Sequence, residues 1–288
     1  MPEDRIRTVL EDLERVLLRF MRHHGISHQE YRRATGLLLA SIRAGEGSLL
    51  LDIFLEAQAA DTGNLGRTGS PEAIEGPFYV PGAPQLSPPH ILPQRPDEAG
   101  DILVFRGRVT GPEGEPVAGV ELDMWQADAA GLYSNVHPGV PDWNLRGCFR
   151  ADAAGWFEVR TIVPPPYEIP KGGPAGRVLA AMERHVFRPA HLHLKLRHPA
   201  YEALTSQLYF RDGLYLESDV AHAVRPDCIA SLVRREGRAQ LLARGLDRPF
   251  FEVRHDFVLA PRPPAPPVAG GGRLAAPPAR TGPEGRRP

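Results

Sequence analysis

The stretch RPAHLH at residues 188–193 holds the residue types best suited to chemistry, because two histidines stand two positions apart. If the stretch is a β-strand, the side chains of His191 and His193 point to the same face, with their Cα atoms roughly 6–7 Å apart. Leu192 and Leu194 then point to the opposite face. Two imidazoles on one face can provide half of a metal site. A pair of half-exposed histidines on a sheet surface would give the same pattern.

The residues that follow the pair do not complete a metal site. A cupin-type site needs a glutamate a few positions later, but LKLR occupies 194–197 and the next acid is Glu202. Zinc would need a further histidine, a cysteine or a carboxylate. The spacing of these residue types therefore leaves the remaining ligands open.

Short strands separated by turns are the elements expected to position this pair. Apolar residues alternate in DILVFRGRV, VELDMWQA, WFEVRTIV, AHLHLKL, LTSQLYF and FEVRHDFVL, all after Asp101. Turn residues such as GPEGEP at 111–116 and DAAG at 152–155 separate several of them. This pattern predicts a mainly β protein with a β-sandwich or barrel, interrupted by one helical insert, GPAGRVLAAMERH.

The N-terminal region has the pattern of helices. Apolar residues at steps of three and four predict a helix over 3–24, and Gly25 ends it. Ser27 and Glu30 form a capping box that starts a second helix, which ends near Arg43. A third helix is expected over 48–60. The wide apolar stripe of the first helix indicates either a small helical cap packed on its own core or a dimerisation element.

The composition is that of an ordinary soluble globular protein. Of the 288 residues 42% are hydrophobic and 24% are charged, and the net charge of −1 gives no sign of nucleic-acid or membrane binding. No secretory signal opens the chain, and the apolar runs are too short to span a membrane. Cys148 and Cys228 are widely separated, as expected of free thiols. We therefore expect a cytoplasmic protein.

These patterns predict a division into three parts. Residues 1–70 form a helical domain, which either packs on its own core or dimerises, and residues 71–260 form a β-sandwich domain that contains the histidine pair. Residues 261–288 are rich in proline and glycine and almost without large apolar side chains. Such a segment cannot bury enough surface to offset its ordering entropy, so we expect a disordered tail.

Several motifs, in order along the chain, resemble the intradiol aromatic-ring-cleaving dioxygenases, the family of catechol and hydroxyquinol 1,2-dioxygenases. The first are IEGPFYVPGAP at 74–84, VELDMWQADAAGLYSN at 120–135 and the NLR at 144–146. PPPYEIPKGGPAG, ERHVF and RPAHLH follow, and LTSQLYF at 204–210 is the last. The resemblance covers about residues 3–258 and includes the three N-terminal helices, through which members of the family dimerise.

The resemblance implies a non-haem Fe(III) ion held by Tyr133, Tyr167, His191 and His193. It implies that both hydroxyls of a catechol bind this ion and that O2 attacks the ring carbon. Tyr167, opposite His193, is released as it takes a proton, while Tyr133 and His191 stay in place. Cleavage between the two hydroxyl-bearing carbons gives a cis,cis-muconate-type diacid. Ferric iron is a strong Lewis acid and lowers the phenol pKa, which is otherwise near 10.

The resemblance also assigns residues around the ion. Arg188 is expected over the ring, where its permanent charge stabilises developing negative charge, and Gln207 near the site of oxygen chemistry. The positions that match the family's ring pocket are Leu49, Asp52, Ile74 and Pro77.

The substrate stays open between catechol and hydroxyquinol. PPPYEIPKGGPAG and Asp52 favour the hydroxyquinol branch, because a carboxylate can accept a hydrogen bond from a third hydroxyl. Gln207 favours the catechol branch. Two functions of other classes are a transthyretin-like sandwich that binds an aromatic ligand without catalysis and a zinc hydrolase that uses the HxH pair. The full set of four ligands argues against the first, and the missing acidic or sulfur ligand argues against the second.

Overall fold

The computed structural model describes residues 3–262, so the predicted disordered tail lies, except for its first two residues, outside the described residues. Those two residues belong to the fold. Pro261 forms a β-bridge with Tyr201, and the Arg262 amide donates to the Ala200 carbonyl. The predicted limits of the helical and sandwich domains stay predictions.

The N-terminal helices form where the pattern predicts them. Their bounds are α1 Glu3–His23, α2 His28–Arg43, α3 Leu49–Leu51, η1 Asp52–Glu56 and α4 Ala57–Asn64. The capping box is confirmed, since the Glu30 amide donates to the Ser27 hydroxyl and Glu30 accepts from the Ser27 amide. The predicted third helix contains a π-helical turn, η1, and extends four residues further than expected.

Two sheets follow. The larger has the order β1-β5-β2-β12-β11, with β13 also paired to β2, and the smaller has the order β10-β9-β8-β3-β4. The strands of the larger sheet are β1 His90–Ile91, β2 Ile102–Thr110, β5 Trp156–Ile162, β11 Val233–Arg235, β12 Phe250–Arg254 and β13 Phe257–Val258. Those of the smaller sheet are β3 Glu121–Trp125, β4 Arg146–Arg150, β8 His191–Arg197, β9 Leu204–Phe210 and β10 Ile229–Ala230.

The remaining elements of residues 3–262 are a two-stranded ribbon, β6 Tyr167–Glu168 with β7 Phe187–Arg188, and three short helices. They are α5 Pro174–Ala181, the 3-10 turn η2 Pro226–Cys228 and α6 Arg238–Leu242. The predicted helical insert is therefore confirmed as α5. Both cysteines are free and buried.

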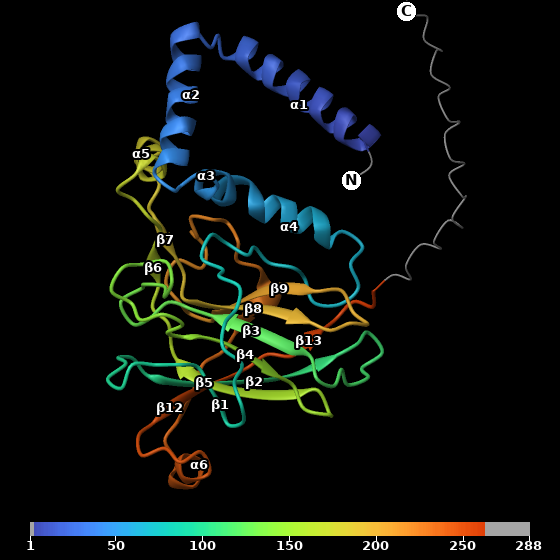
Figure 1. The fold of residues 1–288 in the computed structure, drawn as a ribbon, viewed down its shortest axis with the longest axis vertical. Coiled ribbons are helices and arrows are strands. Elements are labelled where there is room, and N and C mark those ends of the chain that lie inside the picture. The colour runs from blue at the N-terminus through green and yellow to red at the C-terminus, as the bar shows by residue number, and fades with distance from the viewer. Residues whose placement is uncertain (1–2, 263–288) are drawn as a thin grey trace, which may run out of the picture.

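The molecule has three layers, which Figure 1 shows from top to bottom. Helices α3 and α4 lie over the sheet of β3, β8 and β9, and the sheet of β2, β5 and β12 lies beneath it. The main core fills the space between the sheets and includes Leu192 and Leu194 of β8. A second cluster lies on the helix side and includes Leu49 and Ile53. This layering is the predicted β-sandwich with N-terminal helices.

Helix α1 extends away from the body of the molecule (Figure 1) and buries none of its side chains. Its apolar stripe is exposed at Ile6, Val9, Leu10, Leu13, Val16, Leu17, Leu18 and Phe20. Within one copy of the chain, the alternative of a helix packed on its own core is therefore wrong for α1. Among the described residues, no helix is both long and apolar enough to cross a membrane.

Candidate metal centre

The histidine pair lies on β8 with its imidazoles on the helix side of the smaller sheet. Leu192 and Leu194 belong to the core between the sheets, so the side chains of His191 and His193 must point the other way. Both imidazoles are buried, and their Nε2 atoms are 2.9 Å apart. The alternation read from the sequence therefore produces a convergent pair, and the alternative of half-exposed surface histidines is wrong.

The loop after β3 places Tyr133 beside this pair. Asp128 accepts hydrogen bonds from the amides of Ala130 and Leu132, which fixes the turn. Gly131 has φ of +81°, and a Cβ there would be 3.0 Å from the Tyr167 Cβ, so only glycine lets the two segments approach this closely. The Tyr133 ring is fully buried, with its centroid 5.9 Å from that of His193.

The NLR segment holds the same loop from the other side. Arg146 donates from Nε to the Ser134 hydroxyl at 2.9 Å and from Nη2 to the Ser134 carbonyl at 2.9 Å. Its guanidinium carbon lies 5.9 Å from the centroid of the Tyr133 ring. Arg146 is almost fully buried, and burial lowers the pKa of its guanidinium to about 10. The NLR segment thus fixes the loop of Tyr133 through the hydrogen bonds of Arg146 to Ser134.

The ribbon of β6 and β7 positions Tyr167, which is the first residue of β6. Tyr167 pairs with Arg188 across the ribbon, and His191 follows three residues after that arginine. The ring centroid of Tyr167 is 5.5 Å from that of His191 and 5.2 Å from that of Tyr133. The four ligands implied by the resemblance therefore lie together in one buried cluster.

Burial controls the protonation of the cluster. It lowers the pKa of His191 to about 3, with the Arg188 charge adding to the effect, and it lowers the pKa of His193 well below the usual range. Burial also raises the phenol pKa of Tyr133 and of Tyr167. Without a cation, all four groups are therefore neutral at pH 7.

These donors fit a hard trivalent cation. The Nδ1 atom of His191 lies 2.7 Å from the Pro189 carbonyl, so it carries the proton and leaves the Nε2 lone pair directed at His193. The Tyr133 hydroxyl is buried and has no hydrogen-bond partner among the described residues. Two phenolates and two neutral imidazoles would offset most of the charge of Fe(III). Within residues 3–262, no cluster of three or more His, Cys, Asp or Glu side chains offers another metal site.

Arg188 lies directly beside the pair and is buried. Its Nε donates to Asp219 Oδ1 at 3.1 Å and its Nη2 to Asp219 Oδ2 at 3.0 Å. The same Nη2 is 3.0 Å from Gln207 Oε1 and 2.8 Å from the Tyr209 hydroxyl, while Nη1 is 3.2 Å from His191 Nε2. A permanent positive charge is therefore fixed at the edge of the cluster.

Gln207 lies on β9 opposite His193. Its Nε2 donates to the Ile74 carbonyl at 2.9 Å and lies 3.3 Å from His193 Nδ1. Tyr209 is two residues further on the same face, so its place beside Gln207 could have been read from the alternation of LTSQLYF. Asp219 lies in a loop with no recognisable motif, and sequence reasoning gave no signal for it.

The four predicted ring-pocket residues differ in burial. Leu49 and Ile74 are buried, Asp52 is half-buried, and Pro77 is exposed. Leu49 packs in the same cluster as Tyr133 and Tyr167. Burial raises the carboxyl pKa of Asp52, and a hydrogen bond with Ser48 opposes the increase.

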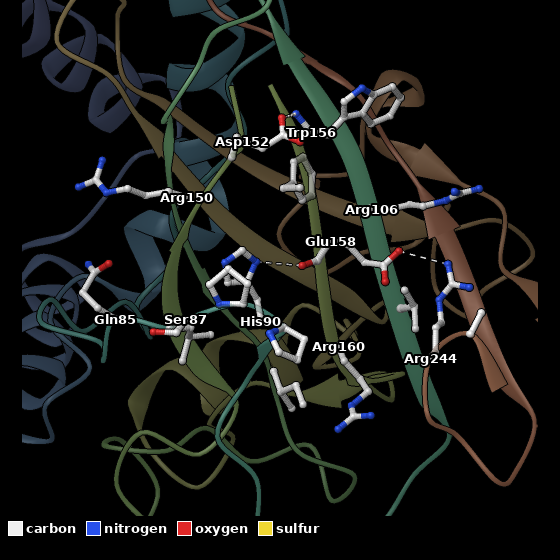
Figure 2. Close-up of a pocket in the computed structure, with 18 residues that line it drawn as sticks. Gln85, Ser87, His90, Arg106, Arg150, Asp152, Trp156, Glu158, Arg160 and Arg244 are labelled. Carbon is white, nitrogen blue, oxygen red and sulfur yellow. Dashed lines mark hydrogen bonds and ion pairs between the residues drawn. The ribbon is translucent and has the colours of Figure 1, made fainter. Parts of the chain in front are cut away.

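A cavity of about 1050 Å³ lies elsewhere, on the outer face of the larger sheet. Figure 2 shows its charged side chains pointing in different directions, with Arg244 paired to Glu158 at 3.1 Å and His90 Nδ1 3.1 Å from the Glu158 carbonyl. None of the predicted site residues lines it. The candidate centre is therefore identified by the chemistry of its donor groups, and cavity volume does not reveal it.

Comparisons with known proteins identify the family of the chain. The profile of a family described as "Dioxygenase" matches residues 74–261. The chain is 34% identical to a chlorocatechol 1,2-dioxygenase of Pseudomonas sp. strain P51 over 83% of this chain and 94% of the relative. It is also 34% identical to a 6-chlorohydroxyquinol 1,2-dioxygenase of Cupriavidus pinatubonensis, over 90% of this chain and 92% of that one. The crystal structure of a 3-chlorocatechol 1,2-dioxygenase from Rhodococcus opacus superposes with a TM-score of 0.82, at 43% identity, and covers 90% of this chain and 99% of that chain.

Proposed function

Since this chain belongs to the intradiol ring-cleavage dioxygenases, the family of catechol, chlorocatechol and hydroxyquinol 1,2-dioxygenases, we propose that it cleaves a catecholic ring with O2 at a ferric centre. The ligands are Tyr133, Tyr167, His191 and His193. One observation carries the proposal: two imidazole Nε2 atoms converge at 2.9 Å in a buried cluster where the Tyr133 hydroxyl has no partner among the described residues. A bound cation would give these atoms a common partner.

When bound, the ferric ion would hold both hydroxyls of the substrate and make the ring electron-rich enough to react with O2. The protein supplies binding, proton transfer and charge. As a phenolate, the Oη of Tyr167 would accept one of the two hydroxyl protons of the substrate. The imidazoles of His191 and His193 remain neutral, because burial disfavours their charged forms. The guanidinium of Arg188 offsets the negative charge that develops at the ring.

Burial also protects the reaction from water. Tyr133, Tyr167 and both histidines are each at most 5% exposed, and helices α3 and α4 cover this face of the sheet (Figure 1). In such a site each electrostatic interaction is stronger than in water. Both atoms of O2 enter the product, and the bond between the two hydroxyl-bearing carbons breaks. The product is a cis,cis-muconate-type diacid.

We propose that two adjacent ring hydroxyls are the feature that defines the substrate. The half-buried carboxyl of Asp52 favours a third hydroxyl, while the names of the relatives include chlorinated rings. Comparison of kcat/KM for catechol, 4-chlorocatechol and hydroxyquinol would rank the three classes. If kcat/KM is highest for hydroxyquinol and Asp52→Asn removes this preference, Asp52 recognises the third hydroxyl.

We also propose that the protein is a homodimer in which the exposed apolar stripe of α1 is covered by a second copy. Eight large apolar side chains on one helix are too many to leave in water in an isolated chain. Homodimer interfaces are more apolar than the rest of a protein's surface, which is the character of this stripe.

The test of the catalytic proposal uses the purified full chain loaded with ferric iron. We expect a visible charge-transfer band from the phenolates and consumption of one O2 per catechol, with a diacid product. Tyr133→Phe should weaken the band, and His191→Ala should reduce bound iron. The control is Tyr201→Phe, which changes a tyrosine outside the cluster and should leave the band intact. A protein that stays colourless with iron and consumes no O2 would contradict the proposal.

A further inference from the structure

The helical layer over the centre contains one irregular turn. Residues Asp52–Glu56 form the π-helix η1 between α3 and α4. A π turn has one more residue than an α turn, so it reorients side chains relative to a regular helix, and such turns are frequent at functional sites. Here it ends on Glu56, whose side chain reaches a different part of the chain.

Glu56 holds the segment that follows the helices. Its Oε1 accepts hydrogen bonds from the amide of Glu75 at 2.8 Å and from that of Gly76 at 3.4 Å. Its Oε2 is buried and has no partner among the described residues. Glu56 as a whole is half-buried, but a buried oxygen without a hydrogen-bond partner is costly to keep for stability alone, so this placement calls for a role beyond packing.

The segment held by Glu56 lies against the candidate centre. Gly76 has φ of +70°, and a Cβ at this position would be 3.8 Å from the His193 Cε1. The carbonyl of Ile74 accepts a hydrogen bond from the side-chain amide of Gln207. This side chain also lies beside His193 and Arg188. A chain of hydrogen bonds thus connects the π turn, through residues 74–76, with the groups around His193.

We propose that Glu56 is a positioning residue that fixes residues 74–76 against His193 and, through the Ile74 carbonyl, the orientation of Gln207. The proposal rests on the proposed function, because its effect on catalysis requires the metal centre. The hydrogen bonds by which Glu56 holds residues 74–76 do not require the metal. Glu56 acts through backbone amides and touches neither metal nor substrate.

Two substitutions separate the possible roles. Glu56→Ala removes the acceptor, so we expect faster hydrogen exchange at the amides of Glu75 and Gly76. In the iron-loaded protein kcat/KM should fall by about 10- to 100-fold, the usual effect of losing a group that orients metal ligands. The fall should lie mainly in kcat, and the visible band should shift at full iron content. Glu56→Gln keeps a carbonyl oxygen at Oε1, and its new amide nitrogen replaces an oxygen that has no partner. The kcat/KM of Glu56→Gln should therefore stay within about fivefold of the wild-type value, a change that corresponds to one ordinary hydrogen bond.

The control is Asp61→Ala on α4, which removes an ion pair with Arg225 outside the centre. It should lower thermal stability without changing the exchange of Glu75 and Gly76 or the visible band. Unchanged exchange in Glu56→Ala, or an equal loss of kcat/KM in Glu56→Gln and Glu56→Ala, would overturn the proposal. A wild-type protein without iron-dependent activity would instead overturn the proposed function. Hydrogen exchange at the amides of Glu75 and Gly76 in the iron-free protein would still test whether Glu56 fixes residues 74–76.

Discussion

At the scale of single residues, Arg188 connects more groups of the candidate centre than any other side chain described above. It is 3% exposed, and its guanidinium contacts Asp219, Gln207, Tyr209 and His191. A buried guanidinium needs a carboxylate, because desolvation of an unpaired charge costs several kcal/mol. Asp219 supplies it with two parallel hydrogen bonds, the geometry that holds arginine most firmly. The position of the positive charge is therefore set by Asp219.

We predict that Asp219→Asn lowers kcat in the iron-loaded protein more than it raises KM. The asparagine has one acceptor oxygen where the aspartate has two, so it can keep only one of the two amide hydrogen bonds, from Ala221 or Ala223, and no longer pairs both donors of Arg188. Because a stabilising charge is displaced, we expect kcat to fall by about 10- to 100-fold, somewhat less than when such a donor is removed outright. Steady-state kinetics with catechol, together with thermal unfolding, would measure both effects.

Glu252→Gln serves as the matched control, since it weakens another buried carboxylate that is paired with arginines far from the centre. It should lower stability and leave kcat unchanged. If Asp219→Asn retained the wild-type kcat, Asp219 would have no positioning role.

At the scale of secondary-structure elements, periodicity in the sequence predicted most of what carries the site. Alternation placed His191 and His193 on one face of a strand, and the capping box started α2 at the observed residue. These features depend on local geometry, which is why a local pattern reveals them. The assembly of the four rings depends on loops, and only the resemblance to a family indicated Tyr133 and Tyr167.

Three features had no readable signal. The π turn at Asp52–Glu56 inserts into a stretch whose apolar spacing suits a regular helix. Strand β4 has the sequence RGCFR, which is short and begins and ends with arginine. The contact of Asp219 with Arg188 joins positions 31 residues apart. Each is set by tertiary packing, which overrides local preference.

The outer face of the larger sheet has its own electrostatic arrangement, from which a pH dependence follows. The Glu252 carboxylate on β12 accepts hydrogen bonds from Arg106 of β2, Arg235 of β11 and Arg244. Burial alone would raise the carboxyl pKa, but the hydrogen bond with Arg235 and the charges of the other arginines lower it on balance. A lowered folded-state pKa means stability that is present above the unfolded pKa and lost as the pH falls through the folded one.

We therefore predict that Glu252→Gln lowers the free energy of unfolding at pH 7 by about 2 kcal/mol, the value of hydrogen bonds to a charged group. The difference from wild type should shrink as the pH falls below about 4.3, the ordinary pKa of glutamate. Urea unfolding at several pH values between 7 and 3 would measure it. A difference that is the same at every pH would mean that the charge of Glu252 contributes nothing.

At the scale of the whole molecule, the candidate centre is separate from the exposed apolar stripe of α1. The candidate centre lies between the smaller sheet and α3–α4, whereas α1 extends beyond the body (Figure 1). None of the side chains of α1 is buried, and none belongs to the clusters that surround the centre. Association through α1 should therefore affect stability without altering the centre itself.

We predict that replacing Leu13 and Leu17 of α1 by glutamate converts a dimer into a monomer. Each leucine is about half exposed in one copy of the chain, so covering the rest of it contributes about 1 kcal/mol, and a dimer covers both leucines of both copies. Since 1.4 kcal/mol corresponds to a tenfold change, the dissociation constant should rise by about 100-fold or more. Sedimentation at several protein concentrations would measure it, and the thermal midpoint of wild type should rise with concentration. Glu11→Gln on the same helix is the control and should remain dimeric. A wild-type chain that sediments as a monomer at every concentration would leave the stripe without its proposed partner.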